Sequence, residues 1–74
     1  MSFGIDRPIH TTLIIYNLLG QKVRTLVDED KLLGSYQVIW DGENEEAKDV
    51  GSGIYFYVIK TKELTQTKKM TLVG

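Results

Sequence analysis

The sequence predicts an all-β fold, a small antiparallel β-sandwich of about six to seven strands, on three observations. Segments in which apolar and polar residues alternate recur at intervals of roughly 8 to 14 residues. Clusters of Gly, Asn and Asp with turn chemistry separate these segments. No run reaches the roughly 18 apolar residues that a membrane helix requires. We therefore expect one domain, residues 1–74, built from short strands around a single core.

The first long strand is expected at residues 9–16, "IHTTLIIY". Pro8 precedes it and fixes φ, which disfavours regular structure between "SFGI" and this segment. The segment is rich in β-branched residues, which fit a pleated surface. Its alternation places Thr11, Leu13 and Ile15 on one face.

The stretch 14–27, "IIYNLLGQKVRTLV", has two interpretations. Its apolar spacing is that of an amphipathic helix, but such a helix would carry Gly20 at its centre, at a cost of about 1 kcal/mol relative to Ala. In a hairpin, Asn17 forms a side-chain-to-backbone turn bond and Gly20 supplies a positive φ. The step from Val23 to Leu26 then requires a bulge or a strand end. We favour the hairpin.

The C-terminal part of the chain continues the alternation after a charged connection, "DEDKLLG", that ends at Gly34. Three further strands are expected, at residues 35–40, 54–61 and 65–73. The shared faces are Tyr36, Val38 and Trp40 in the first, and Met70 and Leu72 in the last. Trp40 is expected to cap the end of the sandwich. In the middle strand, alternation leaves open whether the odd or the even positions of 54–59 face the core.

Composition and single residues argue against catalysis. Nine basic and ten acidic residues give a net charge of −1, which excludes a strong general attraction to nucleic acid. His10 is the only histidine and there is no cysteine, so neither a His-based triad nor a zinc site can form in one chain. The "GSG" at 51–53 precedes a strand and not the helix of a phosphate site. We expect no enzyme, no cofactor and no small-molecule substrate.

The acidic stretch 41–46, "DGENEE", offers several oxygen ligands that calcium could use. Its order does not match an EF-hand loop, whose glycine follows the third ligand position. A solvated acidic turn is the favoured interpretation, with Gly42 adopting the unusual backbone angle.

Four fragments in order carry a family resemblance: "YNLLGQKVRTL", "WDG", "SGIYFY" and "TKKM". Together they resemble the type A C-terminal sorting domains of the type IX secretion system. That family overlaps in sequence with the Ig-like domain of flagellar hook-capping proteins. The resemblance runs from about Ser2 to Val73.

The resemblance implies a small Ig-like or fibronectin-like sandwich that forms the C-terminal piece of a longer secreted protein. Such a tail directs its passenger through the periplasm and across the outer membrane, to be secreted or held at the cell surface. Its partners are the outer-membrane secretion machinery and a sortase-like peptidase. The resemblance also implies that Tyr55, Tyr57 and Ile59 face the core. The N-terminus lacks a signal-peptide pattern, so export would need a signal on the parent chain.

Related domains begin with an early strand in a segment rich in Pro and Asn, whereas this chain begins with "MSFGI". Either the chain is cut from a longer protein or its first strand is missing. A missing strand would leave a sheet edge open, and open edges pair with other chains. We therefore expect self-association.

Candidate partner-recognition residues lie in two places. They are Leu18 and Leu19 at the hairpin tip, and Thr65, Lys68, Lys69 and Met70 in the last strand. Leu19 is expected to tuck under the end of the sandwich, although both leucines could instead dock a partner. The lysines would resist aggregation at a sheet edge or be read by the secretion machinery. Alternative functions are an Ig-like assembly or spacer module and, less favoured, a carbohydrate-binding module that uses aromatic side chains.

Overall fold

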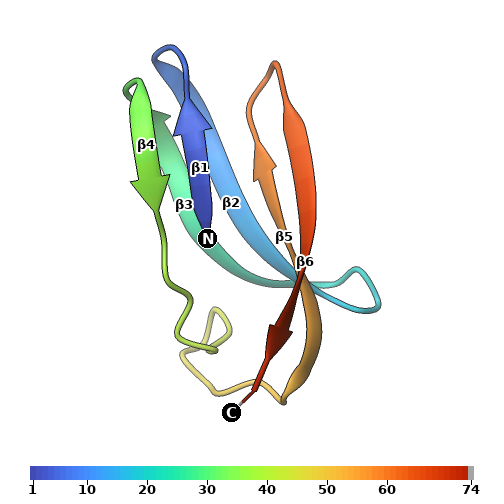
Figure 1. The fold of residues 1–74 in the computed structure, drawn as a ribbon. Helices are drawn as coiled ribbons and strands as arrows, with labels where there is room; N and C mark the ends of the chain where they lie inside the picture. Colours follow the sequence, from blue (N-terminus) through green and yellow to red (C-terminus); the bar gives the residue numbers. More distant parts are fainter. Residues whose placement is uncertain (74) are drawn as a thin grey trace.

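The computed structural model describes residues 1–73, which form six strands and no helix, in two antiparallel sheets. The strands are β1 (Ser2–Ile5), β2 (Ile9–Asn17), β3 (Lys22–Lys31), β4 (Gly34–Gln37), β5 (Gly53–Lys60) and β6 (Thr65–Leu72). β1 pairs with β4, and the larger sheet has the order β3-β2-β5-β6 (Figure 1). This confirms the predicted all-β, sandwich-like fold. Within residues 1–73, no helical segment is long and apolar enough to cross a membrane.

The core lies between the two sheets. Alternate residues of β2 point into it, and Thr11, Leu13 and Ile15 have 0% of their surface exposed, as the alternation predicts. The remaining buried apolar side chains are Phe3, Ile5, Val27, Trp40, Tyr55 and Ile59. The Thr11 hydroxyl is satisfied by donating to the Ile9 carbonyl at 3.3 Å.

β5 presents its odd positions to this core. Tyr55 and Ile59 are buried, and Tyr57 is half-buried against them. The orientation implied by the family resemblance is therefore confirmed. The even positions, Phe56 and Val58, point to the opposite face of the sheet.

Residues 14–27, which had two interpretations, form a β-hairpin of β2 and β3. The Asn17 side-chain Oδ1 accepts hydrogen bonds from the backbone N–H groups of Leu19 and Gln21, at 3.0 and 2.9 Å. Gly20 has φ +82°, which an L side chain rarely adopts. The register between β2 and β3 shifts twice, so that Leu26 and Val23 are each an extra residue in β3. These are the bulges that the broken alternation requires.

Two strand boundaries differ from the prediction by more than one residue. The stretch 28–31 was expected in a connection but extends β3, because the long strand β2 provides pairing partners as far as Ile9. Its charged side chains are tolerated on an edge strand in contact with water. Conversely, β4 ends at Gln37 and not at Trp40. Trp40 leaves the strand to cap the core, with its indole N–H donating to the Glu43 carbonyl at 2.9 Å and its ring edge-on to Tyr55.

An early strand does form, from Ser2 to Ile5, and pairs with β4. Phe3 stacks on its partner Tyr36, with ring centroids 5.5 Å apart. The sandwich is nevertheless unequal, with two strands facing four. β1 has only one neighbour among the described strands, so its other edge carries no strand (Figure 1).

Candidate interaction surface

The tip of the β2–β3 hairpin displays two leucines. Leu18 and Leu19 are 66% and 83% exposed, and the tip projects away from the body of the sandwich (Figure 1). The expectation that Leu19 tucks under the sandwich is wrong. The Asn17 turn bonds close the hairpin over residues 18–20, and this short turn holds Leu19 too far out to fold back onto the core.

The four candidates in β6 do not share one surface. Met70 pairs with Tyr55 and Lys68 with Tyr57, so both lie on the inner face of the sheet. Met70 is partly buried against the core, whereas Lys68 is exposed at the sheet edge. The other two candidates, Thr65 and Lys69, lie on the outer face.

The outer face of the four-stranded sheet carries more apolar side chains than is usual for a face in contact with water. Tyr16 pairs with Phe56, and Ile14 pairs with Val58 in the adjacent row. These four side chains are partly exposed and none belongs to the set that packs against the core. Ile54, one row further along β5, is 41% exposed. The central strands are therefore apolar on both faces, a pattern usual where another layer covers each face.

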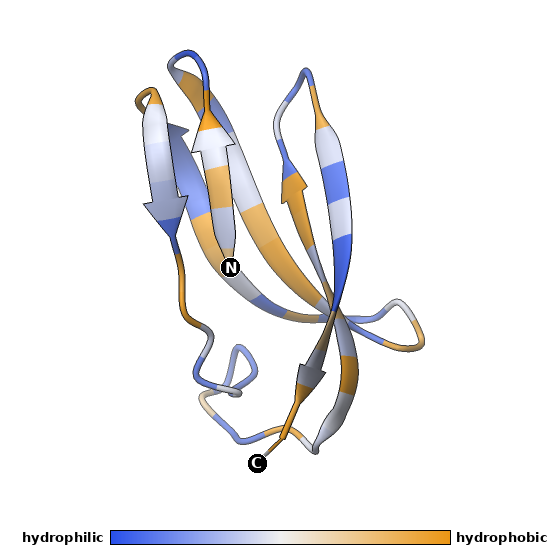
Figure 2. Cartoon of the chain, in the orientation of Figure 1, coloured by the Kyte–Doolittle hydropathy of each residue, from blue (hydrophilic) through white to orange (hydrophobic). Residues whose placement is uncertain are grey.

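Charged side chains border this apolar centre. Lys22 pairs with Tyr16 across from β3, and Lys69 pairs with Phe56 across from β6, so two lysines stand at the ends of one row. Figure 2 shows the hydrophobic middle of β2 and the alternating hydrophilic positions of β6.

A histidine and two carboxylates occupy one end of the same face. The two ring nitrogens of His10 lie 2.9 Å from Asp30 Oδ1 and 2.7 Å from Asp28 Oδ1. Hydrogen bonds to Asp28 and then Asp30 raise the pKa of His10 above its ordinary 6.5, because both carboxylates stabilise the imidazolium. All three side chains are well exposed, as expected for a surface histidine.

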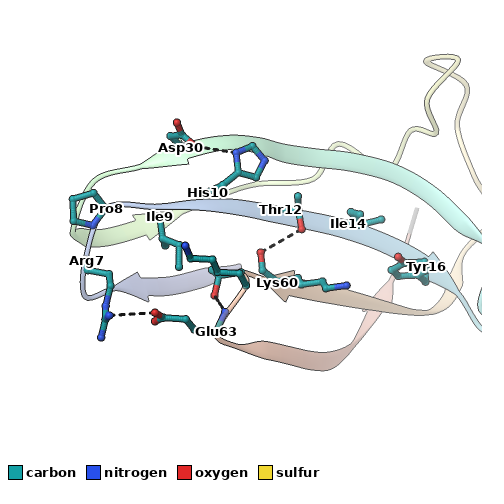
Figure 3. Close-up of a pocket in the computed structure, with 12 residues that line it drawn as sticks. Arg7, Pro8, Ile9, His10, Thr12, Ile14, Tyr16, Asp30, Lys60 and Glu63 are labelled. Carbon is teal, nitrogen blue, oxygen red and sulfur yellow. Dashed lines mark hydrogen bonds and ion pairs between the residues drawn. The ribbon is translucent and has the colours of Figure 1, made fainter.

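A groove of about 880 Å³ follows β2 along the outer face. Thr12, Ile14 and Tyr16 form part of its lining, together with the β5–β6 turn (Figure 3). At the end next to the β1–β2 turn, Arg7 and Glu63 form an ion pair of 3.2 Å. The groove thus combines an apolar floor with charged groups at its end.

The acidic loop is a folded, solvent-facing structure. The side chains of Asp41 and Asn44 accept hydrogen bonds from backbone N–H groups within it, and Gly42 has φ +79°, as predicted. Arg24 reaches from β3 and donates to the carbonyls of Glu43 and Asn44. No group of three His, Cys, Asp or Glu residues suited to a metal ion occurs within residues 1–73.

Analysis of the sequence missed the outer face as a candidate surface, although a signal for it was present. The run 54–59, "IYFYVI", is apolar at every position, and so is the stretch from Leu13 to Ile15. A sandwich of about 70 residues has no third layer to cover a second face. Continuous apolar strands in so small a domain therefore indicate an exposed apolar face.

Residues 3–73 match the CHU_C type IX secretion signal domain family. No curated protein and no solved structure matches the chain significantly.

Proposed function

Because this chain belongs to the type IX secretion signal domain family, we propose that it is a non-catalytic sorting domain that directs an exported passenger to the cell surface. The family match over residues 3–73 is the observation that carries the proposal. In this role the folded domain is recognised by the secretion machinery of the outer membrane, which the passenger crosses from the periplasm. A sortase-like peptidase then removes the domain.

The structure supports this role in a specific way. Its core residues build a small scaffold, and its exposed apolar side chains stand on well-defined turns and strands. Leu18 and Leu19 are held out by the Asn17 turn, while Thr65 and Lys69 lie exposed on the outer face of β6. We assign these four residues to partner recognition. Lys68 lies on the inner face of the sheet and is left outside this set. Met70, which is partly buried, supports β6 from the inner side.

A reporter fusion tests the proposal. The chain is fused to the C-terminus of a fluorescent protein carrying a periplasmic signal, in a host with a type IX system and in the same host lacking the translocon. We expect surface or medium fluorescence only in the first host. Retention of the reporter in the periplasm of both hosts would contradict the sorting role.

A matched pair of variants tests the tip. Leu18→Ser with Leu19→Ser removes the apolar tip, and we expect it to reduce export of the same reporter. Leu32→Ser with Leu33→Ser is the control, because this second exposed pair, at 71% and 67%, lies in the β3–β4 turn. Equal export by the two double variants would remove the tip from the recognition surface.

One observation favours a second candidate, an Ig-like assembly module that associates with copies of itself. The free edge of β1 borders a groove lined by Gly4, Ile5 and the exposed Leu33 and Leu64. Unpaired strand edges beside apolar side chains attract another strand. Sedimentation velocity over a wide concentration range tests this candidate, since self-association would raise the sedimentation coefficient with concentration. A monomer at every concentration would exclude it.

A carbohydrate-binding module has less support. Trp40 and Tyr55, two of the aromatic side chains that could have served such a module, are buried in the core. They are therefore unable to stack on a sugar without unfolding the end of the sandwich.

A further inference from the structure

The outer face of the four-stranded sheet has an apolar centre that the fold itself leaves uncovered. The second sheet, β1 and β4, packs on the inner face, where the core cluster lies. On the outer face, the rows Tyr16–Phe56 and Ile14–Val58 are adjacent, so their side chains form one continuous patch. Contiguous apolar patches on small proteins commonly mark interaction sites.

The charge around this patch is positive, although the whole chain has a net charge of −1. Within residues 1–73, five lysines make no ion pair: Lys22, Lys60, Lys62, Lys68 and Lys69. Four of them surround the patch. Lys22 and Lys69 close the ends of the aromatic row, while Lys60 and Lys62 line the groove.

The acidic groups of the same face are already engaged. The carboxylates of Asp28 and Asp30 both hydrogen-bond His10. Glu63, at the end of the groove, is paired with Arg7. The cationic groups left free on this face therefore favour an anionic partner.

The shape of the face favours an extended segment. The groove follows β2, and the outward residues from His10 to Tyr16 span about 20 Å at the rise of a β-strand. In Figure 3, Thr12, Ile14 and Tyr16 lie in line along β2, with the Lys60 side chain extending beside them. A segment of about six or seven extended residues matches this length, whereas a flat bilayer surface would not enter a groove.

We propose that this outer face is a docking surface for an extended protein segment in which acidic and apolar side chains alternate. The apolar side chains of the partner would pack on Ile14, Tyr16, Phe56 and Val58, and its carboxylates would meet Lys22, Lys60 and Lys69. The inference rests on the proposed sorting role, because it assigns the segment to a component of the secretion machinery. It places the binding surface on the sheet, beside the hairpin tip.

Direct binding is measured with a blocked heptapeptide, Glu-Val-Glu-Tyr-Glu-Val-Glu, titrated into the isotope-labelled chain and followed by NMR. We expect shift changes confined to the outward positions of the four-stranded sheet, including Lys22 in β3 and Lys69 in β6, and weaker binding at high salt. A peptide with Lys in place of each Glu should not bind. Anionic vesicles of mixed phosphatidylcholine and phosphatidylglycerol form a separate arm, and vesicle binding through the same residues without peptide binding would overturn the proposal.

Neighbouring residues of β6 provide matched charge variants. Lys69→Glu reverses a charge on the outer face, while Lys68→Glu makes the same change on the inner face one position away. Both side chains are exposed and lack an ion pair within residues 1–73, so equal thermal stabilities are expected. Lys69→Glu should weaken peptide binding by about three- to tenfold, and Lys68→Glu should leave it unchanged. Equal effects would overturn the proposal.

The apolar part of the surface is tested with Ile14→Thr, which keeps a β-branched side chain on the strand and removes apolar contact area. We expect weaker peptide binding from a folded variant, as judged by its NMR spectrum. Unchanged affinity in the folded variant would count against the patch.

The reporter assay separates this inference from the sorting role on which it rests. If the unaltered chain exports the reporter, the double variant Lys22→Glu with Lys69→Glu should export several-fold less than Lys68→Glu. Export by the double variant at the level of the control would refute the docking surface and leave the sorting role standing. Failure of the unaltered chain would refute the sorting role, while peptide binding would still test the surface.

Discussion

Asn17 closes the hairpin that separates the two interpretations of residues 14–27, and its replacement gives the sharpest test of the fold. Its Oδ1 accepts from the N–H groups of Leu19 and Gln21 at 3.0 and 2.9 Å. Its Nδ2 donates to the Gln21 side-chain oxygen at 2.8 Å. Asn17→Ala removes all three hydrogen bonds while leaving the backbone free to form the same turn.

The expected loss of stability follows from the number and exposure of these bonds. An intramolecular hydrogen bond contributes about 0.5–1.5 kcal/mol net. The turn is exposed, so water can replace the lost partners and each bond falls at the lower end of that range. We therefore expect Asn17→Ala to lower the free energy of unfolding by about 1–2 kcal/mol. This is a large part of the stability of a domain this small.

Urea unfolding followed by circular dichroism measures this change. For a small domain, an m value of about 1 kcal/mol/M converts the loss into a shift of the urea midpoint of about 1–2 M. Asn17→Asp is the matched control, because its carboxylate oxygen still accepts both backbone N–H groups, and we expect it to lose less than half as much. A midpoint for Asn17→Ala equal to that of the unaltered chain would refute the reasoning. So would an equal loss in both variants.

Two further predictions are checked by urea unfolding, the first together with an NMR titration. The raised pKa of His10, caused by its hydrogen bonds to Asp28 and Asp30, stabilises the fold most fully below the unfolded value of about 6.5. This contribution disappears as pH rises through the higher folded pKa, so NMR titration should place that pKa above 6.5, and His10→Gln should remove the pH dependence. A folded-state pKa at or below the ordinary value would contradict this account. Leu13→Ala, at a fully buried position, should cost about 2–5 kcal/mol, whereas Leu19→Ala, at an exposed one, should stay within about 0.5 kcal/mol. Similar losses at the two positions would show that the tip is packed.

Much of the fold could be predicted because its signals are local. The Asn17 side chain accepts hydrogen bonds from backbone N–H groups only two and four residues further along the chain. Such a turn forms without any tertiary partner, so residue type alone predicts it. The positive φ values of residues 20 and 42 could be predicted because both residues are glycines in turn-like segments. The interrupted alternation at Val23 and Leu26 predicts a bulge or a strand end, and the structure has a bulge at each residue.

The candidate site was predicted less well because its signals depend on neighbours. β3 continues through charged residues because β2 is long enough to pair with them, which composition alone does not reveal. Lys68 and Lys69, as neighbours in a strand, lie on opposite faces, but only their pairing with Tyr57 and Phe56 shows that Lys69 is the one on the outer face. Leu19 is 83% exposed, since no part of residues 1–73 extends over the hairpin tip (Figure 1).

By itself, the sequence determined where the chain turns, which residues share a face of each strand, and to which family the domain belongs. These properties follow from turn chemistry and from the two-residue period of a strand, both set by residues close together in the chain. Only the tertiary structure decided which face of β5 is buried, because both faces are apolar and burial depends on where β1 and β4 pack. With two strands facing four, Tyr55 and Ile59 fill the core, and Phe56 and Val58 remain available to a partner.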